Sequence, residues 1–318
     1  MRRWLAGSGA VLAALPMLML SAGPSLAWVS QAHRTVALIA DRLLQQGDAD
    51  ARAKLRALLA TDKDNRFTKN DIASEATWPS VLMEKSDEAR IATAGWHVAR
   101  LKPDSPDLAS ACFGRNPLPE GYPASRGPKE NCVVDKVIQF DQELINAETP
   151  PGERLAALQF LLNLVGDLHD PLNAIDRGDQ GGRCVAIQIG GKPPVRLATY
   201  WQDTLVNEVV GRDPASGAGR IVGTVPAADL RKWAAGKPDD WLLETFELAK
   251  TVTYGFAAAD KPAGKHSFPP AKGESESCGE VDLYRVGADY ETKALAAVKQ
   301  QLAKAGVRLA MLLRADFK

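Results

Sequence analysis

Apolar side chains recur every three or four residues over most of the chain, which is the spacing of an amphipathic helix. The first such pattern consists of Val36, Ile39, Ala40 and Leu43, and the second of Leu55, Leu58 and Leu59. Longer patterns predict further helices at residues 133–144, 155–168, 200–210, 241–256 and 294–313. The sequence therefore predicts a mainly helical protein.

One interval alternates instead. In residues 184–197, valine, isoleucine and leucine occupy every second position on either side of Gly190-Gly191, which predicts a β-hairpin. Residues 102–131 and 261–280 show neither pattern and are expected to be loops. Because no repeat and no clear boundary divides the chain, we expect one mainly α domain with a small hairpin.

The N-terminal 27 residues have the features of a secretory signal peptide. Two arginines precede an apolar stretch, and Ser25-Leu26-Ala27 fits a cleavage site for small residues. A membrane anchor is the alternative, but Pro16 interrupts the stretch, which is also shorter than the roughly 20 residues that a span needs. Cleavage after Ala27 would make Trp28 the N-terminus of a secreted or periplasmic domain, residues 28–318, without stable membrane association.

Composition excludes a disordered or fibrous chain, since 45% of the 318 residues are hydrophobic and 25% are charged. The 39 Lys and Arg balance the 39 Asp and Glu, and loss of the two N-terminal arginines would leave a slight negative charge. No overall positive field is therefore available to hold nucleic acid or an acidic membrane. A polyanionic partner would have to be bound locally.

An oxidising compartment allows the four cysteines to form two disulfides, with three possible pairings. We favour Cys112–Cys132 with Cys184–Cys278, because the first pair brackets a loop rich in Pro and Gly, residues 114–131. Metal ligation by these cysteines is less favoured, since no two of them are close in sequence.

Two segments offer candidate metal ligands. A free amine and the carbonyl oxygen of Trp28 can chelate a metal, and His33 follows five residues later. Asn163 and Asp167 are one helical turn apart within an apolar run, where a buried carboxylate needs a cation or several donors. The alternatives are a core tryptophan and a carboxylate that serves as a cap or in a salt bridge.

Three further residues have plausible structural roles. His97 follows Trp96 in a short apolar segment, as a core histidine would. Asp71 is suited to the N-terminus of a helix. His169 lies about 200° around the helix from Asp167, so we expect it to face away from any ligand of Asp167.

Taken together, blocks of residues in this order resemble the S1/P1 nuclease family of secreted, zinc-dependent single-strand nucleases. The blocks are Trp28 to Arg34, Asp71 to Ser74 with Thr77-Trp78, Trp96-His97, Asn131 to Val134, Phe160-Leu161 through Gly166 to His169 with Pro171-Leu172, Asp176 to Asp179 with Gly181-Gly182, and Ala305 to Leu309. The resemblance implies a mostly helical fold shared with zinc phospholipases C. It also implies a three-zinc cluster that cleaves phosphodiesters and the 3'-phosphates of mononucleotides.

The resemblance assigns one zinc to Trp28, His33 and Asp167, all of which are present. A neighbouring zinc, bridged by Asp167, would use Asp71 and His97, which would make Asp71 and Asp167 catalytic. Its third ligand is a histidine in the family and Asn163 here. The outlying zinc loses every ligand, because the aligned positions are Asn173, Ala198 and Gln202.

We therefore expect one or two zinc ions rather than three. Rescue of the outlying site by other carboxylates is less favoured; the candidates are Asp170, Asp176, Asp179 and Asp203. The residues after His97 lack an aromatic ring for base stacking, although Arg100 could meet a phosphate. Trp201, Trp233 and Trp241 are expected in the core.

Two functions compete at this point. The first is a secreted nuclease of reduced activity that acts on single-stranded DNA or RNA, or on nucleotides. The second is a non-catalytic pseudonuclease whose remaining metal is structural and whose cleft binds nucleotide or phosphate. A phospholipase-like activity rests on fold analogy alone.

Overall fold

The helices of the computed structural model confirm the periodicity. The structure describes residues 28–64, 66–256, 261–269 and 278–318, so the predicted signal peptide lies outside the described residues. The predicted helices correspond to α1 (Ser30–Gly47), α2 (Ala49–Leu59), α7 (Val133–Ile145), α8 (Pro151–Asp167), α14 (Pro238–Leu248) and α16 (Ala288–Asp316). Among the described residues, no helix is both long and apolar enough to cross a bilayer.

Helix α8 forms the centre of the core. All its residues from Ala157 to Asp167 are buried, because other helices surround it. The long C-terminal helix α16 packs along α1, and at their contact a Cβ on Gly306 would lie 2.4 Å from the Cγ2 atom of Ile39. Only glycine allows so close an approach of these two helices.

The predicted helix 200–210 is interrupted by a wider turn. Its first part is α10 (Leu197–Thr199), followed by the π-helical segment η3 (Tyr200–Thr204) and then α11 (Leu205–Val210). The predicted helix 241–256 likewise continues from α14 into a π-helical segment, η4 (Ala249–Thr253). Both segments therefore keep a helical course.

Several short helices have no clear apolar repeat, and of these only the start of α3 after Asp71 was predicted. Some begin at a side-chain cap, such as Asp71 before α3, Ser86 before α5 and Asp213 before α12. The helices concerned are α3 (Ile72–Glu75), α4 (Trp78–Lys85), α5 (Asp87–Thr93), α12 (Pro214–Gly223) and α13 (Ala227–Trp233).

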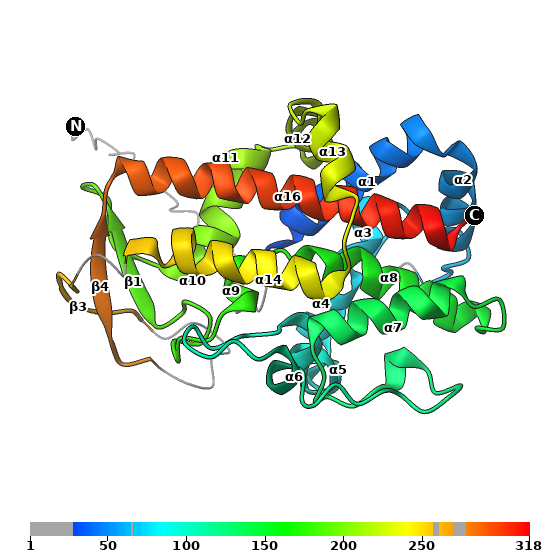
Figure 1. Cartoon of the computed structure of the whole chain (residues 1–318), viewed down its shortest axis with the longest axis horizontal. Coiled ribbons are helices and arrows are strands. Elements are labelled where there is room, and N and C mark those ends of the chain that lie inside the picture. Colours follow the sequence, from blue (N-terminus) through cyan, green and yellow to red (C-terminus); the bar gives the residue numbers. More distant parts are fainter. Residues whose placement is uncertain (1–27, 65, 257–260, 270–277) are drawn as a thin grey trace, which may run out of the picture.

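A sheet of four strands, in the order β2-β1-β4-β3, closes one end of the molecule (Figure 1). Strands β1 (Val185–Ile189) and β2 (Val195–Arg196) pair antiparallel, which confirms the predicted hairpin. Strand β4 (Glu280–Val286) pairs parallel with β1 and antiparallel with β3 (Gly264–Ser267). The prediction of a loop over 261–280 was therefore wrong at β3, where backbone pairing to β4 orders a polar sequence without strand periodicity.

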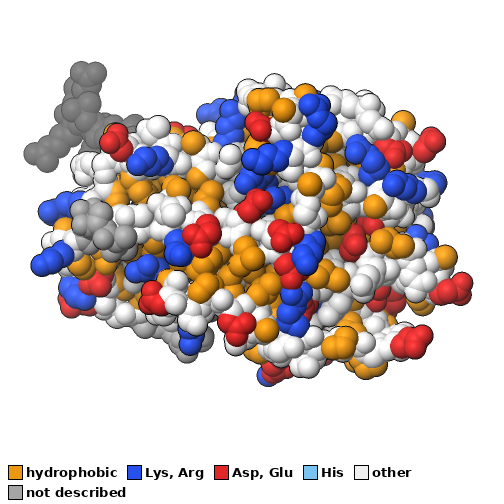
Figure 2. Space-filling model, in the orientation of Figure 1, with side chains coloured by type: hydrophobic (Ala, Val, Ile, Leu, Met, Phe, Trp, Pro, Cys, Tyr) orange, Lys and Arg blue, Asp and Glu red, His pale blue; other side chains and the backbone are white. Residues whose placement is uncertain are grey.

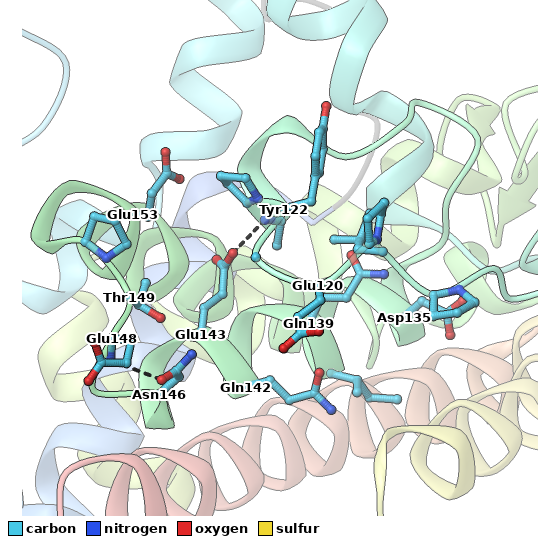
Figure 3. A pocket seen from close by; sticks show the side chains of 18 of the residues that line it. Glu120, Tyr122, Asp135, Gln139, Gln142, Glu143, Asn146, Glu148, Thr149 and Glu153 are labelled. Atoms are coloured by element: carbon cyan, nitrogen blue, oxygen red, sulfur yellow. Dashed lines mark hydrogen bonds between the residues drawn. The ribbon is translucent and has the colours of Figure 1, made fainter.

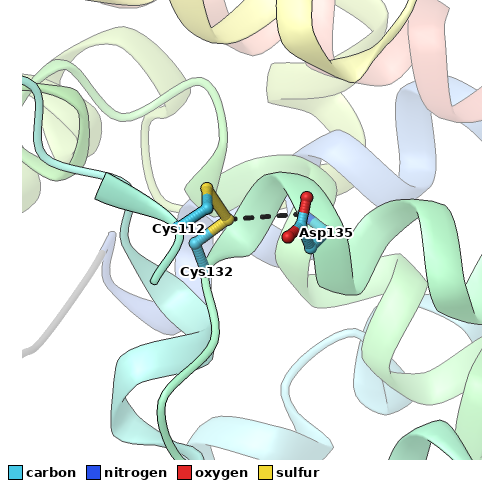
Figure 4. A group of neighbouring side chains, drawn as sticks. All are labelled: Cys112, Cys132 and Asp135. Atoms are coloured by element: carbon cyan, nitrogen blue, oxygen red, sulfur yellow. Dashed lines mark hydrogen bonds between the residues drawn. A yellow bond between two sulfur atoms is a disulfide. The ribbon is translucent and has the colours of Figure 1, made fainter. Parts of the chain in front are cut away.

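The two disulfides join the predicted partners. Cys112 pairs with Cys132, and Cys184 with Cys278. The first ties α6 (Leu108–Ala111) to the start of α7, where the Cys132 sulfur accepts a hydrogen bond from the backbone N–H of Asp135 (Figure 4). The second joins the residues that precede the parallel strands β1 and β4. Residues 102–131 are otherwise mostly loop, with α6 and the short helix η2 (Ala124–Arg126).

Helices α7 and α16 bring two carboxyl groups together. Asp316 is 9% exposed, and its carboxyl neighbours that of the partly buried Asp141. Burial raises the pKa of Asp316 to about 9; the neighbouring Asp141 adds to this effect, and Arg154 opposes it. At neutral pH the folded protein therefore keeps a proton on Asp316, whereas this carboxyl is deprotonated in the unfolded chain.

This pair predicts a pH-dependent stability. Below the pKa of an unfolded Asp, about 3.9, both states are protonated and the pair carries no penalty. As the pH rises from there toward 9, unfolding releases a proton and becomes progressively more favourable. Asp316→Asn, which mimics the protonated acid, should leave the Tm unchanged at pH 4 and raise it at pH 8 by at least about 3 °C.

Thermal unfolding of the wild type and the variant at both pH values measures this effect. Asp104→Asn, at an exposed loop position, is the matched control and should not shift the Tm at either pH. An equal gain at pH 4 and pH 8 would show that Asp316 does not retain a proton in the folded protein.

Candidate metal centre

Two imidazoles flank one buried carboxylate at the end of α8. Asp167 is fully buried, and its Oδ2 atom lies 2.6 Å from Nδ1 of His97. Its Oδ1 atom lies 3.6 Å from Nε2 of His33. The two oxygens thus face different histidines, which is the arrangement of a carboxylate that could bridge two cations.

His33 reaches this carboxylate because α1 passes close to α8. A Cβ on Gly166 would lie 2.8 Å from the Nδ1 atom of His33, so glycine is required there. His33 Nδ1 is 3.1 Å from the carbonyl oxygen of Asn163, to which it donates a hydrogen bond. This role of Gly166 was not predicted from the sequence, although the residue is part of the family resemblance. A glycine inside an apolar helix often has such a packing reason.

The segment that carries His97 is held through the preceding residue, Trp96. It ends the 3₁₀ helix η1 (Ala94–His97), and the indole of Trp96 donates to the carbonyl oxygen of Pro128 at 2.8 Å. The fully buried Lys136 places its Nζ atom 3.8 Å from the centroid of the Trp96 ring and donates to the carbonyl oxygen of Ala124. Burial lowers the pKa of Lys136 to about 8. The loop before α7 therefore fixes the position of His97.

Hydrogen bonding leaves lone pairs pointing into this site. Burial lowers the pKa of His33, and His97 adds to this while Asp167 opposes it, so His33 is neutral at neutral pH. Its Nδ1 proton goes to a carbonyl, which leaves Nε2 as an acceptor. Buried atoms without a partner include His33 Nε2, His97 Nε2, Asp167 Oδ1, Asn163 Oδ1 and Asn173 Oδ1.

These unpartnered acceptors fit a cation. A buried acceptor without a hydrogen-bond donor destabilises the folded protein by about 1–3 kcal/mol. Five such acceptors belong to the residues Asn163, Asp167, Asn173, His33 and His97. Imidazole nitrogen and carboxylate oxygen are also the donors that zinc uses in proteins. The residues present therefore suit a divalent cation at Asp167.

The other predicted ligands lie at the margin of this cluster. Trp28 is 2% exposed, and the next residue, Val29, donates its backbone N–H to the carbonyl oxygen of Gln202 at 3.3 Å. A chelate through the Trp28 amine requires cleavage after residue 27, which lies outside the described residues. Asp71 is exposed and caps α3 by accepting from the backbone N–H of Ser74 at 2.9 Å.

The position of the outlying zinc has few atoms that could coordinate a metal. The Ala198 side chain has no such atom, and the Nε2 atom of Gln202 donates a hydrogen bond to Asp170 Oδ2 at 2.6 Å. Asn173 donates from Nδ2 to the backbone oxygen of Asp167 at 3.3 Å. Burial raises the pKa of Asp170 to about 7, although hydrogen bonds from Leu172 and Gln202 lower it.

The four carboxylates considered for rescue are engaged elsewhere. Asp170 accepts from the backbone N–H of Leu172, Asp176 from that of Gly178, Asp179 from the hydroxyl of Tyr254, and Asp203 from the amide of Asn207. These contacts favour structural roles.

Arg100 lies beside these carboxylates. Its Nε atom donates to the carbonyl oxygen of Leu172 at 3.2 Å. Burial lowers the pKa of Arg100, whereas Asp170, Tyr254, Asp179 and Asp176 act to raise it. Its guanidinium thus already has counter-charges, and a role in binding phosphate stays a prediction.

His169 faces away from Asp167, toward α16. Its Nδ1 donates to the carbonyl oxygen of Val165 at 2.7 Å, and its Nε2 accepts from Arg308 at 2.9 Å. Burial and the Arg308 charge hold the pKa of His169 well below its usual value. Trp201 and Trp241 are fully buried and Trp233 is partly buried against the core, as expected.

Other features of the described residues do not compete with this centre. A tighter grouping of possible ligand atoms, all within 4.8 Å, joins Cys112, Cys132 and Asp135, but both sulfurs are in a disulfide (Figure 4). A groove of about 560 Å³ lies between residues 115–124 and α7, and carboxylates line it (Figure 3). On the face in Figure 2, Lys and Arg alternate with Asp and Glu, without a continuous basic patch.

The whole domain, residues 28–318, is similar to known nucleases. The family model for S1/P1 nuclease matches residues 28–318. Endonuclease 3 of Arabidopsis thaliana is 24% identical, over 92% of this chain and 90% of its own length. Endonuclease 4 of the same plant is 22% identical over the same shares, and Nuclease S1 of Aspergillus oryzae is 22% identical over 89% of each chain.

The unpartnered acceptors predict that a divalent metal stabilises the protein. Zn²⁺ added to metal-free protein that begins at Trp28 should raise its Tm, because a ligand at about 100 times its Kd contributes roughly 2.7 kcal/mol. Asp167→Asn should abolish most of this rise. Differential scanning calorimetry with and without a chelator measures both effects.

The matched control is Asp203→Asn, which changes a carboxylate on η3 that is bonded to Asn207. It should keep the full rise in Tm. A rise that survives Asp167→Asn would mean that the metal binds elsewhere.

Proposed function

The chain belongs to the S1/P1 nuclease family, and on this basis we propose that it is a secreted, metal-dependent phosphodiesterase that cleaves single-stranded nucleic acid at Asp167. We propose further that its metal cluster is depleted and its activity correspondingly low. The observation that carries the proposal is the buried carboxylate of Asp167, which lies between the unpartnered Nε2 atom of His33 and the Nδ1 atom of His97. The family membership supplies the class of reaction.

Residues for two cations are present. One position would be held by Trp28, His33 and Asp167, and the other by Asp167, Asp71 and His97. Divalent cations bound there would supply Lewis acidity toward a phosphoryl oxygen and a lower pKa for a bound water. We expect one or two zinc ions.

The protein's own residues prepare this site before substrate arrives. The hydrogen bond from His97 Nδ1 to Asp167 Oδ2 orients both side chains, and the bond from His33 Nδ1 to Asn163 fixes the other imidazole. Because His33 is neutral at neutral pH, its Nε2 lone pair needs no deprotonation to act as a ligand. Burial of all three side chains also excludes bulk water.

Export supports this use of the N-terminus. Signal cleavage after Ala27 would create the amine that chelation by Trp28 requires. The two disulfides suit an oxidising compartment outside the cytoplasm. We therefore place the active form in the periplasm or outside the cell.

The outlying position is the reason to expect low activity. A cation there would stabilise the leaving oxygen, but Ala198 offers no donor and the Gln202 amide nitrogen is bonded to Asp170. Removing one stabiliser of transition-state charge costs on the order of 10²–10³ in rate. Substrate would therefore be bound and attacked at Asp167 with little help for departure of the leaving group.

The same observation favours the second candidate, a non-catalytic relative. In that case the residual metal stabilises the fold and the cleft binds a nucleotide or phosphate. The Gln202–Asp170 bond would then be part of the fold rather than a defect in an enzyme.

Nuclease assays separate the two candidates. Protein that begins at Trp28, supplied with Zn²⁺ or Mn²⁺, should cleave single-stranded DNA or RNA slowly, and His97→Ala should lower the rate at least about 100-fold. The restored variant N163H/N173H/A198H/Q202D should raise kcat by about 100-fold or more, because it returns the missing donors.

His266→Ala is the control, because this histidine lies in strand β3 and packs on Phe268 rather than at Asp167. It should leave the rate unchanged. No turnover by the wild type together with turnover by the restored variant would assign the chain to the non-catalytic class. No turnover by either protein would contradict the proposed site.

A further inference from the structure

Asn163 stands where the family resemblance implies a zinc-binding histidine, and its side chain has a fixed orientation. The amide Nδ2 lies 2.9 Å from the carbonyl oxygen of Ala76 and 3.2 Å from the hydroxyl of Ser80. A backbone carbonyl can only accept a hydrogen bond, so the amide atom that faces it must be the nitrogen. The oxygen of Asn163 therefore points elsewhere.

That oxygen is buried and has no protein partner. Asn163 is fully buried, and its Oδ1 atom receives no hydrogen bond. Asn163 lies one helical turn before Asp167 on the same face of α8, and its backbone oxygen accepts from His33. Three further buried acceptors without a hydrogen bond belong to the other residues considered for the metals, namely Asp167 Oδ1 and the Nε2 atoms of His33 and His97. Of these, Asp167 Oδ1 and His33 Nε2 face each other at 3.6 Å.

All these atoms are acceptors. The Nδ1 protons of both histidines are used in hydrogen bonds, to Asn163 and to Asp167, so each Nε2 atom carries a lone pair. Adding the amide oxygen of Asn163 makes four buried acceptors. Buried acceptors without donors are destabilising until protons or a cation reach them.

We propose that Asn163 is a metal ligand through Oδ1, and that it converts the position shared by Asp167, Asp71 and His97 into a weak site for harder divalent cations. This inference rests on the proposed function for the location of the metals. Carbonyl and carboxylate oxygens suit Mg²⁺, Ca²⁺ and Mn²⁺, whereas imidazole favours zinc. The position of Trp28 and His33 keeps its nitrogen donors and stays a zinc site.

Asn173 shows why the proposal concerns one position only. Its Nδ2 also faces a backbone carbonyl, that of Asp167 at 3.3 Å, and its Oδ1 is also unpartnered. The other two ligand positions of the outlying zinc offer little to a cation, since the Ala198 side chain has no coordinating atom and the Gln202 amide is bonded to Asp170. One amide oxygen alone does not bind a cation, whereas Asn163 shares a face of α8 with the Asp167 carboxylate, and its backbone oxygen accepts from the His33 imidazole.

Metal counting tests the assignment without any assay of turnover. After dialysis against metal-free buffer, protein that begins at Trp28 should retain one zinc, measured by elemental analysis. Millimolar Mn²⁺ should then add one bound Mn²⁺, detected as loss of the free-ion signal in electron paramagnetic resonance.

Asn163→His should retain two zinc ions after the same dialysis. At the second position, the Kd for Mn²⁺ divided by the Kd for Zn²⁺ should be at least 10-fold larger in this variant than in the wild type. The matched control is Asn116→His, which adds the same side chain at an exposed position and should behave as the wild type. The wild-type measurements decide the matter even if Asn163→His fails to fold.

Three results would overturn the inference: two zinc ions retained by the wild type, no Mn²⁺ bound at millimolar concentration, or an unchanged zinc count in Asn163→His. Mn²⁺ bound as expected, in a protein that cleaves no nucleic acid, supports the inference and contradicts the proposed function. The two proposals can therefore fail separately.

Discussion

The contact that organises this molecule is the buried carboxylate of Asp167 between His33 and His97. These three residues come from α8, α1 and η1, so helices distant in sequence must meet at one point. A buried carboxylate is tolerated only with donors or a cation around it. The requirement to surround Asp167 therefore constrains the packing of the domain, down to a glycine at position 166 that leaves room for an imidazole.

The rest of the fold supports this contact from two sides. Helix α16 packs along α1 and holds the end of α8 through the bond between Arg308 and His169. On the other side, buried Lys136 and Trp96 connect the loop before α7 to the segment that carries His97. Each of these links uses a buried charged or neutral polar group whose partners are complete. At the centre itself, by contrast, His33 Nε2 and Asp167 Oδ1 remain without hydrogen-bond partners.

Much of this arrangement could be predicted from the sequence, because helical periodicity and alternation are local signals. The longer helices, the hairpin and the disulfide pairing were expected, and the structure confirms them. Strand β3 was missed because its order comes from hydrogen bonds to β4, which its polar side chains do not show. The roles of Gly166 and Lys136 depend on neighbours far away in the chain, and no local pattern reveals such contacts.

The substituted ligand positions show most clearly what a sequence leaves undecided. From the sequence alone, asparagine and glutamine are equally poor zinc ligands, since each side-chain amide has one oxygen and one nitrogen. The structure separates them, because the Asn163 nitrogen is held by a carbonyl on the α3 side while the Gln202 nitrogen is held by Asp170. At Asn163 this leaves a buried oxygen free beside a carboxylate. Replacing a family ligand by an amide, a histidine at Asn163 and an aspartate at Gln202, is therefore expected to lower zinc affinity at both positions, but only at Asn163 would it supply a hard oxygen ligand.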